Sequence, residues 1–278
     1  MQSDVILHHR NSLIQHGHNN NRVYVMKIDA DDCHDIIRFA DELAAKEGYT
    51  KIFAKVRESW QEMFSRAGYI TEATVPFFFH GTETGLFMAK YFDPTRTVAR
   101  DATVLADVLS TAFGYAGERS SHEVPEGFSL MHAHPGDAEE IAALYRQVFE
   151  SYPFPIFDPE YIRKTMQSHI RYYVIKKSHV LAAVASCEID GENQNVEVTD
   201  FATNPLFRGR GFAGILLSAM ETDMKNDGVL LSYTIARAIF KPINAVFVGA
   251  GYQFGGMLPN NTNICGSMES MNVWYRKL

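Results

Sequence analysis

One segment, residues 196–213 (VEVTDFATNPLFRGRGFA), restricts the fold more than any other part of this chain. It begins as a strand, turns at Pro205, and passes through the glycine-rich stretch Arg208–Gly211 into a helix. A helix that starts directly after glycines presents unpaired backbone N–H groups and the positive end of its dipole at one point. The segment therefore predicts a layered α/β protein with an anion-binding turn at the end of a strand.

The glycine-rich turn matches neither of two common nucleotide motifs. A Walker A loop requires G-x-x-x-x-G-K-[ST], and the dinucleotide pattern G-x-G-x-x-G is also absent. Gly209 and Gly211 would let the backbone approach an anion closely. Arg208 and Arg210 would add two positive charges. Judged alone, the turn leaves two interpretations: a phosphate site, or an ordinary strand-to-helix turn with solvated arginines.

The rest of the chain alternates between strand and helix patterns. Strands are predicted at residues 23–28, 49–56, 70–80, 85–92, 128–132, 171–176, 179–189, 195–202, 230–236, 252–258 and 271–275. Helices are predicted at residues 29–46, 58–67, 94–118, 137–149, 159–168, 211–226 and 242–249. This order is typical of a mixed α/β architecture, in which helices pack against the faces of a sheet.

A polar segment with Pro and Gly, residues 117–127, separates two domains. We expect an N-terminal arm, a first domain and a second domain, at residues 1–21, 22–120 and 128–278. Both domains contain a helix–strand–helix–strand order, and in both the second helix ends on an A-G-Y step, at 67–69 and 250–252. We interpret the first domain as a degenerate copy of the second.

The composition excludes several classes of protein. Of the 278 residues 46% are hydrophobic and 12% aromatic, which is enough to build packed cores. A net charge of −7 argues against a general nucleic-acid binder, which normally carries a basic face. No stretch reaches the ~18 apolar residues of a membrane span, and the start of the chain lacks the pattern of a secretory signal. We therefore expect a cytoplasmic protein without nucleic-acid or membrane partners.

Neither disulfides nor metal sites are expected. Cys33, Cys187 and Cys265 lie far apart and form no C-x-x-C pair, which fits a reducing compartment. Two H-x-H pairs, at 16–18 and 132–134, have no third ligand at a fixed spacing. We interpret the first pair as part of a polar turn and assign no metal.

Several segments together resemble the GNAT superfamily of N-acetyltransferases. Residues 208–213, RGRGFA, fit the superfamily signature R/Q-x-x-G-x-G/A at the expected distance from a strand end, and residues 244–252, NAVFVGAGY, look like its later helix and the step into the next strand. Three tail segments are similar, more narrowly, to the beta-lysine N-acetyltransferases: TIARA at 234–238, GGMLPNNTNI at 255–264 and ESMNVW at 269–274. The resemblance covers residues 128–278.

The resemblance implies a fold and an activity. The fold would be a C-terminal GNAT domain preceded by a degenerate, partial GNAT-like domain. The activity would be acetylation of the side-chain amine of beta-lysine, a small-molecule partner, with acetyl-CoA as co-substrate and a compatible solute as product. Two alternatives stay open: another small amine such as lysine or a polyamine, or an inactive acyl-CoA-binding sensor. A homodimer is also left open.

The resemblance further implies a cofactor site. The turn would hold the CoA pyrophosphate through backbone N–H groups, and the preceding strand end would pair with the pantetheine arm like an added strand, where it commonly bulges. Asn244 would lie near the pantetheine on the later helix. The implied cofactor-binding residues are Phe201, Ala202, Thr203, Arg208, Gly209, Arg210, Gly211, Phe212, Ala213, Asn244 and Phe247.

The reaction needs a base, because an alkylammonium with a pKa near 10.4 is neutral in only about one molecule in a few thousand at pH 7. Glu197, six residues before Thr203, lies where several family members place a catalytic glutamate. Asp200 is the second choice, and the period of two along a strand puts it on the opposite face from Glu197. For both, a solvent-facing strand carboxylate is the alternative.

No general acid can be assigned from the sequence. Phe247 stands where many members carry a tyrosine that protonates the leaving thiolate, and a core phenylalanine is the simplest interpretation. The role of that tyrosine could be taken by Tyr233, by Tyr252 or by a bound water, or the thiolate could leave without being protonated.

A substrate with one carboxylate and two amines needs a cation, acidic groups and polar amides. The tail supplies such groups, and the candidates for substrate contact are Arg237, Asn260, Asn261, Asn263, Glu269, Ser270 and Asn272. Alternatively, the N-N-T-N cluster at residues 260–263 forms turns, which asparagine favours. In the first domain the acidic segment 29–35, DADDCHD, lies where a phosphate turn would be and would repel phosphate. We therefore expect only the second domain to hold the cofactor.

Overall fold

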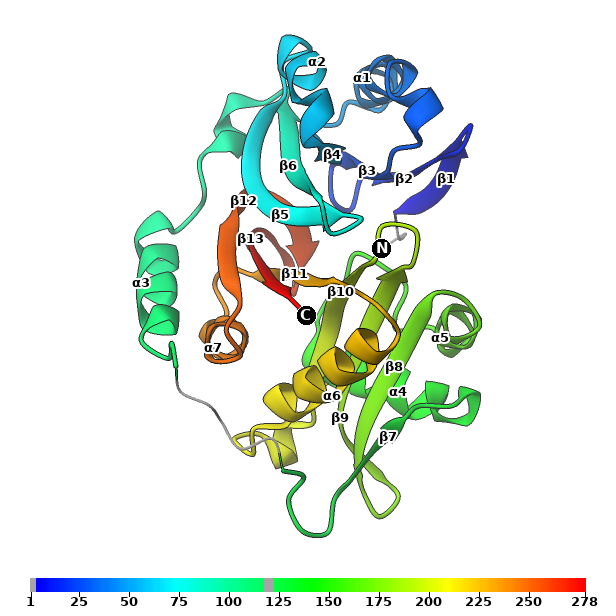
Figure 1. Cartoon of the computed structure of the whole chain (residues 1–278), viewed down its shortest axis with the longest axis vertical. Coiled ribbons are helices and arrows are strands. Elements are labelled where there is room, and N and C mark those ends of the chain that lie inside the picture. Colours follow the sequence, from blue (N-terminus) through cyan, green and yellow to red (C-terminus); the bar gives the residue numbers. More distant parts are fainter. Residues whose placement is uncertain (1–3, 118–122) are drawn as a thin grey trace.

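The computed structural model describes residues 4–117 and 123–278, which form one continuous sheet flanked by helices (Figure 1). The strands in the described residues lie in the order β1-β2-β3-β4-β6-β5-β12-β13-β11-β10-β9-β8-β7. Their bounds are β1 Val5–His9, β2 Ser12–Gly17, β3 Arg22–Lys27, β4 Lys51–Arg57, β5 Ile70–Phe79, β6 Glu83–Tyr91, β7 Ser129–His132, β8 Ile170–Lys177, β9 Val180–Asp190, β10 Asn195–Thr203, β11 Leu231–Arg237, β12 Gln253–Ile264 and β13 Ser267–Lys277.

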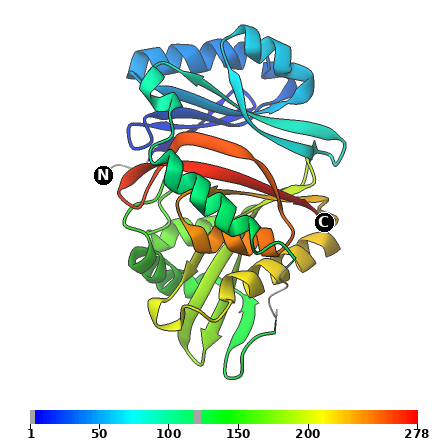
Figure 2. The same cartoon turned by 90° about the vertical axis from the view of Figure 1, so that its left-hand side faces the viewer.

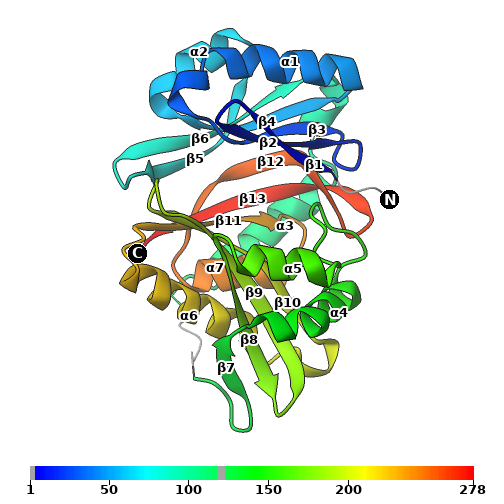
Figure 3. The same ribbon diagram turned by 90° about the vertical axis from the view of Figure 1, so that its right-hand side faces the viewer.

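Helices cover this sheet at both ends of the molecule. In Figures 2 and 3, α1 and α2 lie over the N-terminal strands, and α4 to α7 lie around the C-terminal strands. The bounds are α1 Asp35–Glu47, α2 Gln61–Arg66, α3 Ala102–Phe113, α4 Ala138–Val148, α5 Pro159–Met166, α6 Phe212–Asn226 and α7 Lys241–Gly249. Short 3-10 turns are η1 Ala30–Asp32, η2 Glu58–Trp60, η3 Pro94–Thr97, η4 Pro135–Asp137 and η5 Pro205–Phe207. None of the helices in the described part is long and apolar enough to cross a membrane.

The two halves of the sheet repeat one topology. In the N-terminal half β3 and β4 run parallel with α1 between them, and the hairpin β5–β6 adds β6 beside β4. In the C-terminal half β10 and β11 run parallel with α6 between them, and the hairpin β12–β13 adds β13 beside β11. The same element order and strand directions support the internal repeat that the sequence predicts.

The halves join edge to edge where β5 meets β12, with Gly256 opposite Ala73. Gly256 has a φ of 144°, and a Cβ at this position would lie 2.3 Å from the carbonyl oxygen of Glu72. Only glycine tolerates both conditions. Behind the junction the halves share an apolar core, in which Phe78 packs edge-on against Tyr233 with the ring centroids 4.9 Å apart. The two halves therefore share one sheet and one apolar core at the junction.

Three segments differ from the sequence predictions. Instead of a polar arm, residues 5–17 form β1 and β2, because apolar side chains such as the fully buried Ile14 complete the N-terminal core. The single helix predicted at 94–118 divides into η3 and α3. Within η3, the buried Arg96 donates to backbone oxygens of Asn20 and Asn260. The N-N-T-N cluster lies inside β12 rather than in a turn. Part of the predicted linker, residues 118–122, lies outside the described residues.

Candidate active site

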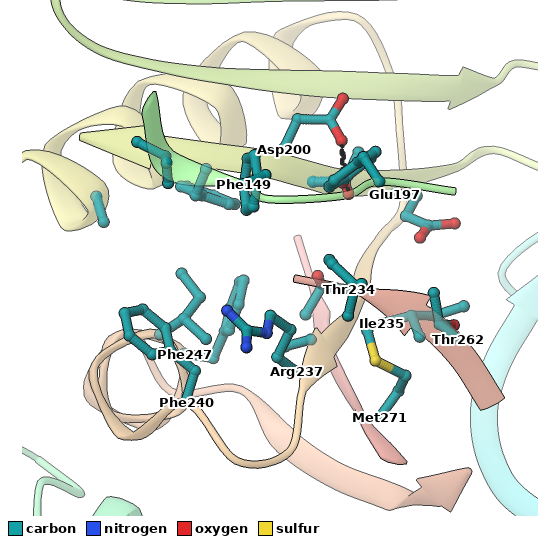
Figure 4. A pocket seen from close by; sticks show the side chains of 18 of the residues that line it. Phe149, Glu197, Asp200, Thr234, Ile235, Arg237, Phe240, Phe247, Thr262 and Met271 are labelled. Carbon is teal, nitrogen blue, oxygen red and sulfur yellow. Dashed lines mark hydrogen bonds between the residues drawn. The ribbon is translucent and has the colours of Figure 1, made fainter. Parts of the chain in front are cut away.

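A cavity of about 700 Å³ opens where β10 and β11 separate (Figure 4). The two strands pair only over Asn195–Glu197 and Leu231–Tyr233, at the base of a wedge. Beyond this point β10 forms one wall of the cavity and Thr234–Arg237 of β11 forms the opposite wall. The separation exposes backbone N–H and C=O groups on both sides, and such an edge can accept an extended ligand as an additional strand.

A bulge in β10 shapes the first wall. The pairing of β10 with β9 shifts between Thr199 and Ala202, and Asp200 has a φ of 56°. The extra residue interrupts the alternation of side chains along the strand. Glu197 and Asp200 consequently both line the cavity (Figure 4), so the expectation that they lie on opposite faces is wrong.

The glycine–arginine turn, residues 208–213, lines one end of the cavity. Gly209 and Gly211 adopt φ angles of 78° and 74°, values that an L-residue rarely adopts, although a Cβ at either would meet no atom within 4 Å. The glycines are thus required by the backbone conformation and not by space. Gly211 is the N-cap of α6, so the unpaired N–H groups of the first helical turn are directed toward this end.

The two arginines of the turn are available to an anion. Within residues 4–117 and 123–278 neither Arg208 nor Arg210 forms an ion pair, and the Arg210 guanidinium lies 5.7 Å from the ring centre of Phe128. Two cations beside a helix N-terminus provide a binding site for a pyrophosphate.

Two residues predicted to contact the cofactor do not line the cavity. Ala202 is buried on the other side of the strand, in a core with residues of α4 and α5. The Asn244 side chain is fully buried, donates to the carbonyl oxygens of Arg237 and Phe240, and accepts bonds from Trp274 and Asn272. With its donors and acceptor occupied, this amide holds α7 against β11 and β13.

Phe247 forms part of the apolar wall. It is fully buried and packs edge-on against Phe201 and Tyr252, with ring centroids 5.8 and 5.1 Å apart. This is the environment of a core phenylalanine. Tyr252 bonds to Ser232 Oγ at 2.6 Å, and Tyr233 lies 3.0 Å from Lys55 Nζ; neither tyrosine lines the cavity.

Three carboxylates gather in the wedge: Glu197, Asp200 and Glu188, which lies on β9 directly opposite Glu197. Burial raises the pKa of Glu197 above its ordinary value, and the positive charge of Lys55 opposes that effect only in part. Burial and the neighbouring carboxylates also raise the pKa of Glu188. A carboxylate with a raised pKa is a stronger base, so the group is suited to take a proton from an amine.

Asp200 is held in place by hydrogen bonds. Its carboxylate accepts bonds from the hydroxyl of Tyr152 and, at 2.6 Å, from Ser186 Oγ. Burial raises the pKa of Asp200 and these bonds lower it. Because both its oxygens already accept bonds, Asp200 is less available as a base than Glu197.

The candidate substrate residues of the tail separate into two groups. Arg237 and Asn261 line the cavity; Arg237 is neutralised by Glu269 through two bonds of 2.8 and 2.6 Å. Asn263, Glu269 and Asn272 do not line it. The Asn263 side chain donates to the carbonyl oxygen of Asn19, and Asn272 donates to Asn244, so both stabilise the fold instead.

The sequence analysis missed one whole wall of the cavity. Arg22, Tyr24, Met26 and Phe53 come from β3 and β4 of the N-terminal half, and all four line it. Glu188 and Tyr152 were missed as well. The signal available in the sequence was a charged residue, Arg22, at the start of an apolar strand. Among the described residues, no group of three or more His, Cys, Asp or Glu side chains is placed to hold a metal ion.

The chain is similar in sequence to known acetyltransferases. Residues 139–240 match the Acetyltransferase (GNAT) family. Over 271 residues, 98% of both chains, the sequence is 37% identical to the beta-lysine N(6)-acetyltransferase of Methanococcus maripaludis, and over 160 residues, 58% of this chain and 59% of the relative, it is 40% identical to that of Methanosarcina mazei. Among solved structures, the ribosomal-protein-S18-alanine N-acetyltransferase of Escherichia coli superimposes with a TM-score of 0.48 and 13% identity, covering 54% of this chain and 93% of the other.

The fold, the site and the family match define the class of protein: an N-acetyltransferase with the GNAT fold. Within that class, the chain belongs to the beta-lysine N(6)-acetyltransferase family.

Proposed function

We propose that the protein transfers the acetyl group of acetyl-CoA to the N6 amine of beta-lysine. The observation that carries the proposal is one cavity with opposite charges at its two parts. Two arginines that form no ion pair within residues 4–117 and 123–278 lie at a helix N-terminus, and three buried carboxylates lie in the wedge between β10 and β11. The first suits a pyrophosphate and the second an ammonium. The family relatives named above are enzymes of this reaction.

The residues of the turn fit the co-substrate, which supplies an activated thioester carbonyl when bound. Backbone N–H groups at the start of α6, with Arg208 and Arg210, would hold the pyrophosphate. The free edge of β10 at Phe201 and Thr203 would align the pantetheine arm. At the bulge, a backbone N–H released from the ladder would polarise the carbonyl oxygen.

Glu197 would act as the base. It would accept one proton of the substrate ammonium, and the neutral amine would then attack the thioester carbon. As the C–N bond forms and the C–S bond breaks, the second proton would leave the nitrogen for the departing thiolate or for solvent, giving the amide and CoA. No tyrosine stands at 247 to protonate the sulfur, and a thiol with a pKa of about 8.5 can leave as the thiolate. The product keeps one ammonium and one carboxylate, so it has no net charge, as suits a compatible solute in the cytoplasm.

Purified protein with acetyl-CoA and a panel of amines tests the proposal. Thiol release and the product mass should identify N6-acetylation of beta-lysine, with lower kcat/KM for lysine and spermidine. If acetyl-CoA raises the unfolding midpoint but no amine is acetylated above background, the protein is an acyl-CoA sensor. If spermidine or lysine is preferred, the proposed substrate is wrong.

A further inference from the structure

The end of the cavity remote from the glycine–arginine turn is closed by the N-terminal half. In Figure 4, Phe240 and Phe247 lie toward one end, and Thr262 and Met271 lie toward the other, beside the ribbon of that half. Arg22 Nη1 lies 3.2 Å from Thr262 Oγ1, which places the guanidinium at this remote end. The first half therefore supplies a cation to a cavity that the second half alone would leave open.

Arg22 carries a buried positive charge. Its side chain is almost completely buried, with 3% of the residue exposed, yet within the described residues it forms no ion pair with a carboxylate. Nη1 donates to the carbonyl oxygen of Asn261 at 2.6 Å and to Thr262, while Nε is buried and makes no hydrogen bond in the described part. Burial lowers the pKa of Arg22 to about 10, so it is still charged at neutral pH.

A second polar group beside Arg22 also lacks a partner. Asn261 lines the cavity and is 1% exposed, and its buried side-chain oxygen accepts no hydrogen bond within the described residues. Buried polar atoms without partners are rare in folded proteins, because each one loses its hydrogen bonds to water and gains none in return. Arg22 and Asn261 both line the cavity, and neither side chain has all its hydrogen bonds made within the described residues, which suits a ligand that carries an anion and an amine close together.

We propose that Arg22 binds the carboxylate of the amino-acid substrate and that Asn261 accepts a hydrogen bond from the adjacent amine. This inference rests on the proposed function. In beta-lysine the carboxylate and the C3 amine are separated by one methylene group, and three methylenes lead from C3 to the N6 amine. The head would lie at the N-terminal half, with the methylenes along Phe53 and Met271 and with N6 near Glu197.

Arg237, the cation expected from the sequence, does not suit this role. Glu269 already occupies its guanidinium through two short bonds, so a substrate carboxylate would have to displace that partner. Among the described residues, no carboxylate forms an ion pair with Arg22. The structure thus assigns the carboxylate to the first half of the chain and the reacting amine to the second.

Substrate analogues test the assignment without any change in the protein. We expect 1,4-diaminopentane, which is beta-lysine without its carboxylate, to have a kcat/KM about 100-fold or more below that of beta-lysine, because Arg22 is left unpaired. The analogue 6-aminohexanoate, without the C3 amine, should lose less. If 1,4-diaminopentane is as good a substrate as beta-lysine, the proposal is overturned.

Variants locate the effect at Arg22. Arg22→Met should raise the KM for beta-lysine by about 100-fold, leave the KM for acetyl-CoA near its original value, and abolish the preference over 1,4-diaminopentane. Arg22→Lys keeps the positive charge but loses the planar, two-pronged guanidinium, so its KM for beta-lysine should lie between those of the original protein and Arg22→Met. This variant serves as the test if Arg22→Met does not fold. The matched control is Arg57→Met: Arg57 also joins the halves, 3.3 Å from Asn193 Oδ1, but does not line the cavity.

The outcomes separate this inference from the proposed function. Without amine acetylation by the unaltered protein, the proposed function fails. If the unaltered protein acetylates beta-lysine but both Arg22 variants keep its preference over 1,4-diaminopentane, the assignment of Arg22 alone fails. Equal losses in the Arg22 and Arg57 variants would indicate that the halves only need to stay joined.

Discussion

The N-terminal and C-terminal halves share a topology but differ at the point where their parallel strands separate. In the C-terminal half, β10 continues from Val198 to Thr203 beyond its pairing with β11, and the turn after it contains Gly209 and Gly211 with positive φ. In the N-terminal half, the pairing of β3 with β4 ends at Val25, and β3 extends only two residues further, to Lys27. The turn η1 follows, with Asp29, Asp31 and Asp32 in or next to it. Asp32 of that turn is buried and accepts bonds from Ser12.

The difference shows how one architecture serves two tasks. A wide wedge with a basic turn can hold an extended anionic ligand, whereas a short wedge with an acidic, internally bonded turn cannot. The N-terminal half instead presents the open face of β3 and β4 to its neighbour, and that face forms a wall of the cavity. The copy that lacks the basic turn thus contributes a wall to the cavity of the other copy.

The largest expected effect concerns the base. Glu197→Gln should lower kcat by about 10²–10⁴-fold at pH 7, because the amide cannot accept the proton of the ammonium. The loss should shrink as pH rises and more substrate amine is neutral. Steady-state rates across pH measure this, with the exposed Glu192→Gln as control. An unchanged rate would remove Glu197 as the base.

The next effect concerns the turn that only one half possesses. Replacing Arg208 and Arg210 together by Ala should raise the KM for acetyl-CoA by about 10- to 100-fold, since each charge-assisted bond contributes about 1.5–3 kcal/mol before solvent screening. Asp31→Ala, in the corresponding turn of the N-terminal half, should leave it unchanged. A comparable rise in the KM for acetyl-CoA in Asp31→Ala would contradict the claim that only the turn of the C-terminal half binds acetyl-CoA.

The junction between the halves provides a test by stability. Gly256→Ala should destabilise the protein by a few kcal/mol, because its Cβ would overlap the carbonyl oxygen of Glu72 and the residue has a positive φ. Gly209→Ala, with a positive φ but open space, should cost only about 1 kcal/mol. Denaturant unfolding compares them. Equal costs would show that β5 and β12 are not tightly joined.

The smallest effect concerns the acidic cluster and pH. Because the pKa of Glu188 is raised, the folded protein binds more protons than the unfolded chain above the ordinary glutamate pKa of about 4.3. The free energy of unfolding therefore falls as pH rises through this window. Glu188→Gln cannot titrate and therefore does not lose this stability. The difference in unfolding midpoint between the variant and the original protein should grow in favour of the variant by about a few °C from pH 5 to pH 8. A constant difference would contradict the raised pKa.

The sequence predicted what local patterns determine. The order of strands and helices, the repeat and the turn at 208–213 follow from periodicity, glycines and caps. It did not predict that Asp200 faces the cavity, because a bulge has no reliable local signal. Nor did it reveal Arg22, whose role depends on a junction between residues nearly two hundred positions apart, Ala73 and Gly256. The sequence also did not indicate the hydrogen bonds of Asn244 and Asn272, because their partners lie on other elements.

The central claim is that acetyl-CoA binds to the C-terminal half while the carboxylate end of the amine substrate binds to the N-terminal half. The two KM values, measured in Arg22→Met and in the Arg208 and Arg210 double variant, test it most directly. We predict a crossed result: the first variant loses affinity for beta-lysine alone, and the second loses affinity for acetyl-CoA alone. A rise of both KM values together in either variant, or an unchanged KM for beta-lysine in Arg22→Met, would contradict the account.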